Sequence, residues 1–141
     1  MSNIDTSDLD DFAKTLLEYS IVEHPKKSKK FLQQEGNKLR KKTLSKAKSL
    51  TNKKTGNYYK GIKRGKVYSY GSKNNKSVRV YGGSPHAHLI EYGHRQVTKD
   101  GKEVGYVEGK RIYEKSKNEF EREFNKDCED FAEDMLKELS E

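Results

Sequence analysis

The sequence has no tryptophan, one cysteine, two prolines and few apolar residues. The single cysteine, Cys128, excludes an intrachain disulfide and a cysteine-based zinc site, and we expect it to be a small buried core residue. No run of about 18 apolar residues occurs, so we expect neither a membrane span nor a secretory signal peptide. We therefore expect the protein to be made and used in a cytoplasm or in a particle assembled there.

Hydrophobic residues make up only 30% of the 141 positions, against 37% charged residues. A chain this polar either stays partly disordered or completes its burial against a partner. Nine tyrosines and five phenylalanines argue against disorder, because aromatic rings bury large areas. The composition thus predicts one domain over 1–141, with a thin core and an oligomeric state.

Charge is distributed in three blocks that sum to a net charge of +8. Residues 1–24 carry one base and six acids, and residues 83–141 carry ten bases and fifteen acids. Between them, residues 25–82 hold nineteen bases and one acid, Glu35. A basic middle between acidic ends indicates either contact with nucleic acid or charge matching between helices or subunits.

Apolar residues at helical spacing predict three helices. The first begins at the capping residue Ser7 and runs to about Val22, where His24-Pro25 ends it. A second runs from about Pro25 to Leu50 and presents a narrow stripe on an otherwise basic surface. The last runs from about Ile112 to Leu139 and is strongly acidic, so we expect it to pair with the basic helix, within the subunit or between neighbours. The stripes of the two long helices are Leu32, Gly36, Leu39, Thr43, Ala47 and Leu50, and Phe120, Phe124, Cys128, Phe131 and Met135.

The part between these helices, residues 56–110, has the pattern of strands. β-branched and aromatic residues predict an antiparallel meander of Tyr58–Ile62, Lys66–Tyr70 and Ser77–Tyr81. Further on, Asp100-Gly101 suits a tight turn, so residues 96–104 form a hairpin. Its apolar content is low, which favours a projecting arm. The fold class is therefore α+β: a helical part (1–52), a sheet part (56–110) and a C-terminal helix (111–141).

The densest segment is the central motif, residues 82–95, read as one or two helical turns or as a short strand. In the helical reading Ser84 is the N-cap, Pro85 takes the first helical position and Gly93 follows the end. Core contacts would come from Ala87, Leu89, Ile90 and Tyr92, with Glu91 and the histidines at a rim.

The histidines and Glu91 of the motif invite two chemical readings, and we favour neither. His86, His88 and His94 with Glu91 could be imagined as a metal site, but no second ligand cluster supports one. Glu91 and His94 could form an acid–base pair, but no nucleophile, phosphate-binding loop or paired carboxylate accompanies them. We expect no catalytic residue, no metal and no cofactor.

Three blocks carry a resemblance to a known family. They are Thr55–Ile62 (TGNYYKGI), Ala87–Arg95 (AHLIEYGHR) and Gly105–Lys110 (GYVEGK). In order and spacing they resemble the minor tail-component family of tailed bacteriophages, the head-to-tail joining or tail-completion proteins. The resemblance implies a structural virion protein, present as a ring between the tail tube and the head or collar. Its implied partners are itself and tail-tube, tail-terminator or connector proteins, with assembly in the bacterial host cytoplasm.

Two surfaces are candidates for contacts. A subunit or partner interface is expected at His88, Glu91, Tyr92, His94, Arg95, Val97, Val104 and Tyr106. A DNA- or partner-facing basic surface is expected at Lys38, Lys41, Lys42, Lys46, Lys63, Arg64, Lys66 and Arg79. Because tyrosines interleave with these cations, the alternative function is nonspecific nucleic-acid binding, which requires little more than positive charge.

Overall fold

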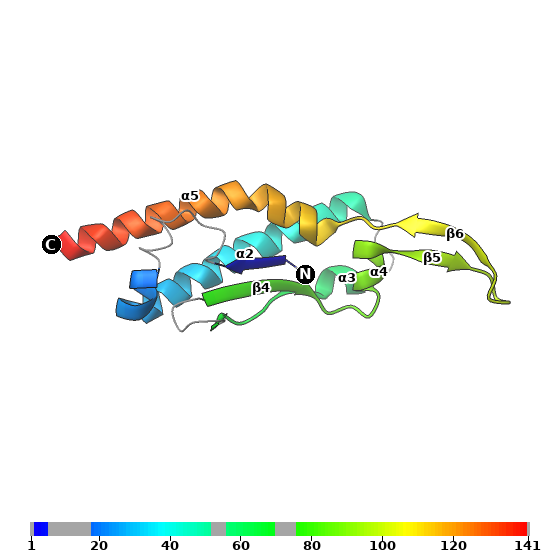
Figure 1. Ribbon diagram of the computed structural model, residues 1–141, viewed down its shortest axis with the longest axis horizontal. Coiled ribbons are helices and arrows are strands. Elements are labelled where there is room, and N and C mark those ends of the chain that lie inside the picture. The colour runs from blue at the N-terminus through cyan, green and yellow to red at the C-terminus, as the bar shows by residue number, and fades with distance from the viewer. Residues whose placement is uncertain (1, 6–17, 52–55, 70–75, 141) are drawn as a thin grey trace.

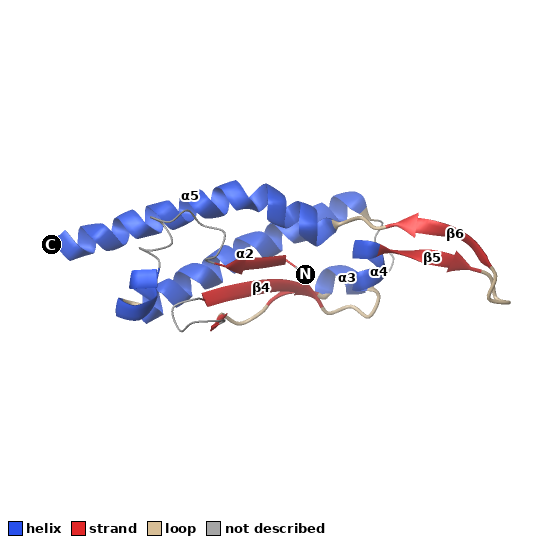
Figure 2. Ribbon diagram, viewed as in Figure 1, coloured by secondary structure: helices blue, strands red, loops and turns tan. Residues whose placement is uncertain are grey.

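The computed structural model describes residues 2–5, 18–51, 56–69 and 76–140. They form an elongated molecule in which two long helices run along a small antiparallel sheet (Figure 1). A separate two-stranded hairpin projects from one end of the long axis (Figure 2). The predicted α+β class, with a long C-terminal helix and a projecting hairpin, is confirmed.

The two long helices, α2 (Pro25–Leu50) and α5 (Ile112–Ser140), agree with their predicted spans. Residues 18–23 are helical and His24 interrupts the helix, as expected; the rest of the predicted first helix lies outside the described residues. The predicted stripes form the core, with half-buried Leu50 and Phe131 at its margin. Phe31 and Phe131 stack at 4.5 Å between ring centroids. Buried members of the stripes include Leu32, Leu39, Thr43, Ala47, Phe120, Phe124, Cys128 and Met135.

Ion pairs connect α2 and α5 along their length. Lys27 Nζ lies 2.6 Å from Glu138 Oε1, Lys38 Nζ 2.7 Å from Asp127 Oδ2, and Lys46 Nζ 2.5 Å from Glu119 Oε1. Pairing of the basic helix with the acidic helix therefore occurs within one subunit. Exposed pairs of this kind contribute at most about 1 kcal/mol each, so they set alignment more than stability.

Glu35 is the exception on this interface, because its side chain is buried among the stripes. Burial, a hydrogen bond to Asp127 and the charge of Asp127 raise the pKa of Glu35 to about 8, although Lys38 opposes the shift. Burial would raise the pKa of Asp127 too, but hydrogen bonds with Glu35 and Lys38 outweigh it and lower that pKa. At neutral pH Glu35 is therefore largely protonated and Asp127 is the charged partner of Lys38.

The sheet is centred on β4 (Lys76–Gly82) and is not the predicted meander. One edge of β4 pairs with β1 (Ser2–Asp5), a strand that the sequence patterns did not indicate. The other edge pairs with both β2 (Ile62–Arg64) and β3 (Tyr68–Ser69). These two act as one interrupted strand, because the amide of Gly65, between them, still donates to the carbonyl of Arg79 at 2.7 Å.

The predicted strand over Tyr58–Ile62 is also wrong in its first part, which is the short helix α3 (Asn57–Lys60). Gly56 turns the chain there with a left-handed backbone (φ 78°). The hydroxyl of Tyr59 then lies 2.8 Å from the hydroxyl of Thr51, just past the end of α2. Tyr58 and Tyr59 pack against the hydrophobic core, and this packing overrides their β propensity.

Candidate functional site

The central motif is the short helix α4 (Ala87–Tyr92), which decides between the helical and strand readings. Its N-cap is His86, not Ser84, and Pro85 belongs to the turn before the helix. Gly93 follows the end as predicted, with a positive φ of 86°.

Glu91 is buried, contrary to the prediction that it lies at a rim, and only 5% of it is exposed. Its Oε1 accepts a hydrogen bond from the amide of Tyr113 (2.9 Å) and its Oε2 accepts one from the amide of Glu114 (3.1 Å). These amides belong to the first turn of α5, where helix geometry leaves N–H groups without partners and favours negative charge. Glu91 thus caps α5 from another element. The sequence indicates that α5 needs a capping group from elsewhere. The residue before Ile112 is Arg111, whose side chain has no hydrogen-bond acceptor for the free amides of the first turn.

Backbone contacts complete the joint between α4 and α5. The amide of Lys110 donates to the carbonyl of Ile90 at 2.7 Å, and the amide of Arg111 donates to the carbonyl of Glu91 at 3.2 Å. A Cβ atom at Gly109 would collide with the backbone of Glu91, and one at Gly93 would collide with the carbonyl of Val107. Only glycine therefore fits at positions 93 and 109.

Between these glycines lies a hairpin, residues 93–108, that we call the arm. It consists of β5 (Gly93–Val97) and β6 (Glu103–Glu108), paired antiparallel with a register shift between Gln96 and Val97. In the turn, the amide of Gly101 (φ 83°) donates to the carbonyl of Thr98. His94 and Arg95 lie inside the ladder, so the root of the arm is at Gly93 and Gly109.

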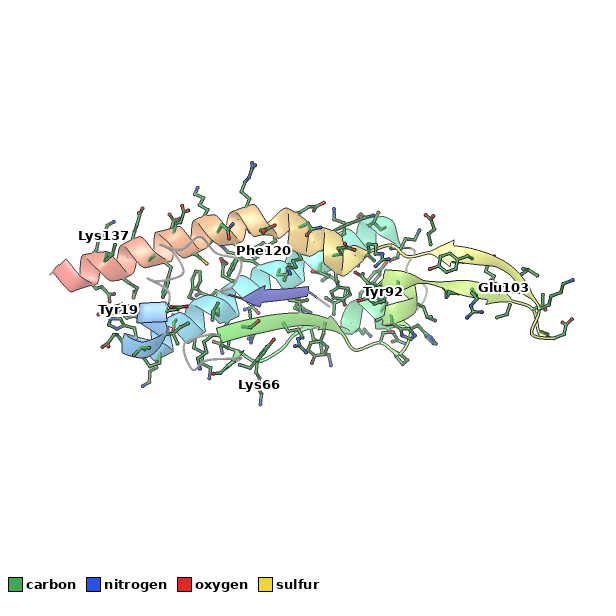
Figure 3. The ribbon with its side chains drawn as sticks, viewed as in Figure 1. Tyr19, Lys66, Tyr92, Glu103, Phe120 and Lys137 are labelled. Atoms are coloured by element: carbon green, nitrogen blue, oxygen red, sulfur yellow. The ribbon has the colours of Figure 1, made fainter. Side chains whose placement is uncertain are left out.

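The arm and its root expose apolar and aromatic side chains to solvent. Val97 and Val104 are each 61% exposed, Tyr106 is 59% exposed and Tyr92, at the root, is 50% exposed. Tyr106 donates its hydroxyl hydrogen to the backbone carbonyl of Tyr92 at 2.9 Å, which ties the Tyr106 side chain to the root of the arm. Figure 3 marks Tyr92 at the root and Glu103 toward the tip. We call Tyr92, Val97, Val104 and Tyr106 the apolar set of the arm.

A cleft of about 670 Å³ lies beside the root of the arm, where α3, α4 and the end of α2 meet. His94 and Val107, which pair across the arm, contribute to its wall. Burial raises the pKa of Tyr58 in this wall to about 12, with the charge of Glu91 adding to the effect. The apolar lining includes Leu50, Tyr58, Tyr59, Leu89 and Ile90.

The remaining predicted residues fall in several places. His88 is exposed on α4, and Arg95 lies 3.8 Å from Glu103 on the arm. Lys38 and Lys46 of the predicted basic surface are paired with α5, whereas Lys41 is exposed elsewhere on α2 and Lys42 is half-exposed. The members on the sheet are Lys63, Arg64, Lys66 and Arg79.

Within residues 2–5, 18–51, 56–69 and 76–140, no group of three or more histidine, cysteine or acidic side chains is placed to hold a metal ion. Glu91, the imagined fourth ligand, is occupied by the amides of α5. None of the described helices is long and apolar enough to cross a membrane.

Comparison with protein families gives one match. The model of the HK97-gp10-like family, described as the candidate tail component gp10 of bacteriophage HK97, matches residues 10–93, more than half of the chain. The chain belongs to the HK97-gp10-like family. Membership places it among bacteriophage tail components, in accord with the resemblance seen in the sequence. The HK97-gp10-like match ends at Gly93, so the arm and α5 lie beyond it. No curated protein and no solved structure matched the chain.

Proposed function

We propose that this HK97-gp10-like chain is a tail-completion or neck component, in which several copies form a ring between the tail tube and the head or collar. It is a structural role without catalysis, assembled in the bacterial host cytoplasm and retained in the virion or tail-like particle. The observation that carries the proposal is the arm: a narrow projection with four large apolar side chains exposed, on a chain whose family is one of tail components.

The stability of the arm depends on a surface that covers it. A two-stranded hairpin is marginal in water unless a third strand or a helix covers one face. Covering the apolar set would stabilise the arm by about 25 cal/mol for each Å² of apolar surface removed from water. A projecting surface that fits a different surface on a second copy gives head-to-tail contacts, and these close into a ring when the rotation allows it. The partners are therefore other copies of this chain and tail-tube, tail-terminator or connector proteins.

The first test replaces valines at the tip of the arm. We expect Val97→Asp/Val104→Asp to weaken assembly by about 100-fold or more, because two apolar contacts are lost and two charges must be desolvated. Size-exclusion chromatography with light scattering, on the protein alone and with tail-tube or connector proteins, measures this. Ser45→Asp/Asn118→Asp, at exposed positions on α2 and α5, introduces the same charge and should assemble normally. A wild-type monomer under every condition, with no partner binding, would contradict the proposal.

A second test uses trypsin as a probe of the arm. Lys99 and Lys102 lie in its exposed turn, where hydrogen bonds between Thr98 and Lys102 offset only part of the roughly 1–2 kcal/mol per residue of backbone ordering. We expect cleavage there in the free subunit well before cleavage in the sheet, and protection in assembled particles. Equal resistance in both states would mean that the arm is already stable within its own subunit.

A further inference from the structure

The sheet has one face covered by helices and one face turned away from them. Along β4, Val78 and Val80 are fully buried in the core, so the alternating residues Arg79 and Tyr81 point to the opposite side. Lys63 is opposite Tyr81 in the ladder, and Tyr68 is opposite Ser77. Lys66, in the gap between β2 and β3, extends away from both long helices (Figure 3).

These residues surround a shallow hollow of about 430 Å³, lined by Gly65, Lys66, Tyr68, Arg79 and Tyr81. The guanidinium carbon of Arg79 lies 5.4 Å from the centre of the Tyr68 ring. Its Nη2 also donates to the Tyr68 hydroxyl at 3.2 Å, so Tyr68 fixes the orientation of the cation. Gly65 also lines the hollow, and a Cβ atom there would lie 3.6 Å from the Tyr81 ring.

Two lysines of this face differ in their surroundings from the α2 lysines that contact α5. Lys27, Lys38 and Lys46 are neutralised by carboxylates of α5. In the part of the chain that the structure describes, neither Lys63 nor Lys66 lies within ion-pair distance of a carboxylate, and both are exposed. Within the described residues, Lys63 and Lys66 of the sheet face therefore lack the carboxylate partners that Lys27, Lys38 and Lys46 of α2 have.

We propose that this hollow and the flanking lysines bind the phosphodiester backbone of a nucleic acid. An arginine guanidinium that is held in place by a neighbouring ring presents its planar fork to a phosphate at reduced entropic cost. Lys63 and Lys66 supply further phosphate contacts, and the ring of Tyr81 offers a stacking surface for an unpaired base. The proposal is separate from the arm, which lies at the end of the molecule beyond α4, and does not depend on ring formation.

Fluorescence anisotropy with a labelled oligothymidylate and a labelled mixed-sequence duplex tests the proposal. We expect Lys63→Gln/Lys66→Gln to weaken binding about tenfold at low salt. It should also reduce the slope of log affinity against log salt by about 1.4 for the single strand, since each phosphate contact contributes about 0.7. The control Lys41→Gln/Lys48→Gln removes the same charge from the exposed side of α2 and should leave binding within about twofold. Arg79→Lys, which keeps the charge but loses the fork, should weaken binding to both probes.

The two probes distinguish base stacking from phosphate contact. Tighter binding of the single strand indicates stacking on Tyr81, and equal binding indicates phosphate contact alone; either supports the site. The proposal is overturned if neither probe binds, if the α2 control loses as much affinity as the sheet variant, or if polyglutamate displaces the oligonucleotide as effectively as unlabelled DNA. Light scattering on the same variants should give unchanged assembly, which distinguishes failure here from failure of the proposed ring.

Discussion

Replacing Glu35 with glutamine is expected to stabilise the protein at alkaline pH by up to about 5 kcal/mol. The pKa of Glu35 is about 8 in the folded chain against 4.5 for the unperturbed group, so the folded state holds the proton more tightly. Its contribution to stability is then complete below about pH 4.5 and is lost as the pH rises toward 8. The wild-type free energy of unfolding should therefore fall over this range, and Glu35→Gln should remove that fall.

Urea denaturation followed by circular dichroism between about pH 5 and 9 measures the effect. The gain from Glu35→Gln should be smallest at pH 5 and largest at pH 9. Glu119→Gln is the matched control, because its carboxylate is exposed and a hydrogen bond from Lys46 lowers its pKa. The free energy of unfolding of Glu119→Gln should not rise above that of the wild type at high pH. Parallel curves for wild type and Glu35→Gln would show that Glu35 is ionised in the folded state.

Glu91→Ala is expected to lower the free energy of unfolding by about 3 kcal/mol. The change leaves the amides of Tyr113 and Glu114 without their acceptor and removes a negative charge from the N-terminus of α5. It also loosens α4 at the root of the arm, so trypsin should reach Lys99 sooner. Thermal and urea unfolding measure the first effect and limited proteolysis the second.

Two variants bracket this result. Glu91→Gln keeps one acceptor oxygen and should lie between wild type and Glu91→Ala. Glu108→Ala, an exposed carboxylate at the end of β6, should change stability by less than about 0.5 kcal/mol. A loss for Glu91→Ala as small as that of Glu108→Ala would mean that water replaces the cap without cost.

The parts of the fold that could be predicted are those with long periodic patterns. The stripes of α2 and α5 repeat over many turns, and both helices, together with burial of Cys128, follow from them. The hairpin follows from Asp100-Gly101, because turn chemistry is local. The exposed apolar residues of the arm were likewise among the predicted interface residues, although their role as an interface remains a proposal.

The errors concern short segments whose structure depends on distant partners. Residues 2–5 are a strand only because β4 offers them an edge, and nothing in their own sequence indicates this. The predicted meander is wrong because β2 and β3 both pair with the same edge of β4. The sequence predicts a rim position for Glu91 because carboxylates are rarely buried. Its burial follows from the uncapped first turn of α5, more than twenty residues further along the chain.

The order of the elements has a consequence for synthesis on the ribosome. β1 is made before its partner strand β4 (Lys76–Gly82), and about seventy residues are made between the two strands. The basic helix α2 emerges long before α5, which both covers its apolar stripe and supplies its carboxylate partners. Until α5 has left the exit tunnel, the nascent chain is strongly cationic and has an open core. Chains that lack α5 should therefore attract chaperones and proteases, and only chains that include α5 should reach the assembly pathway.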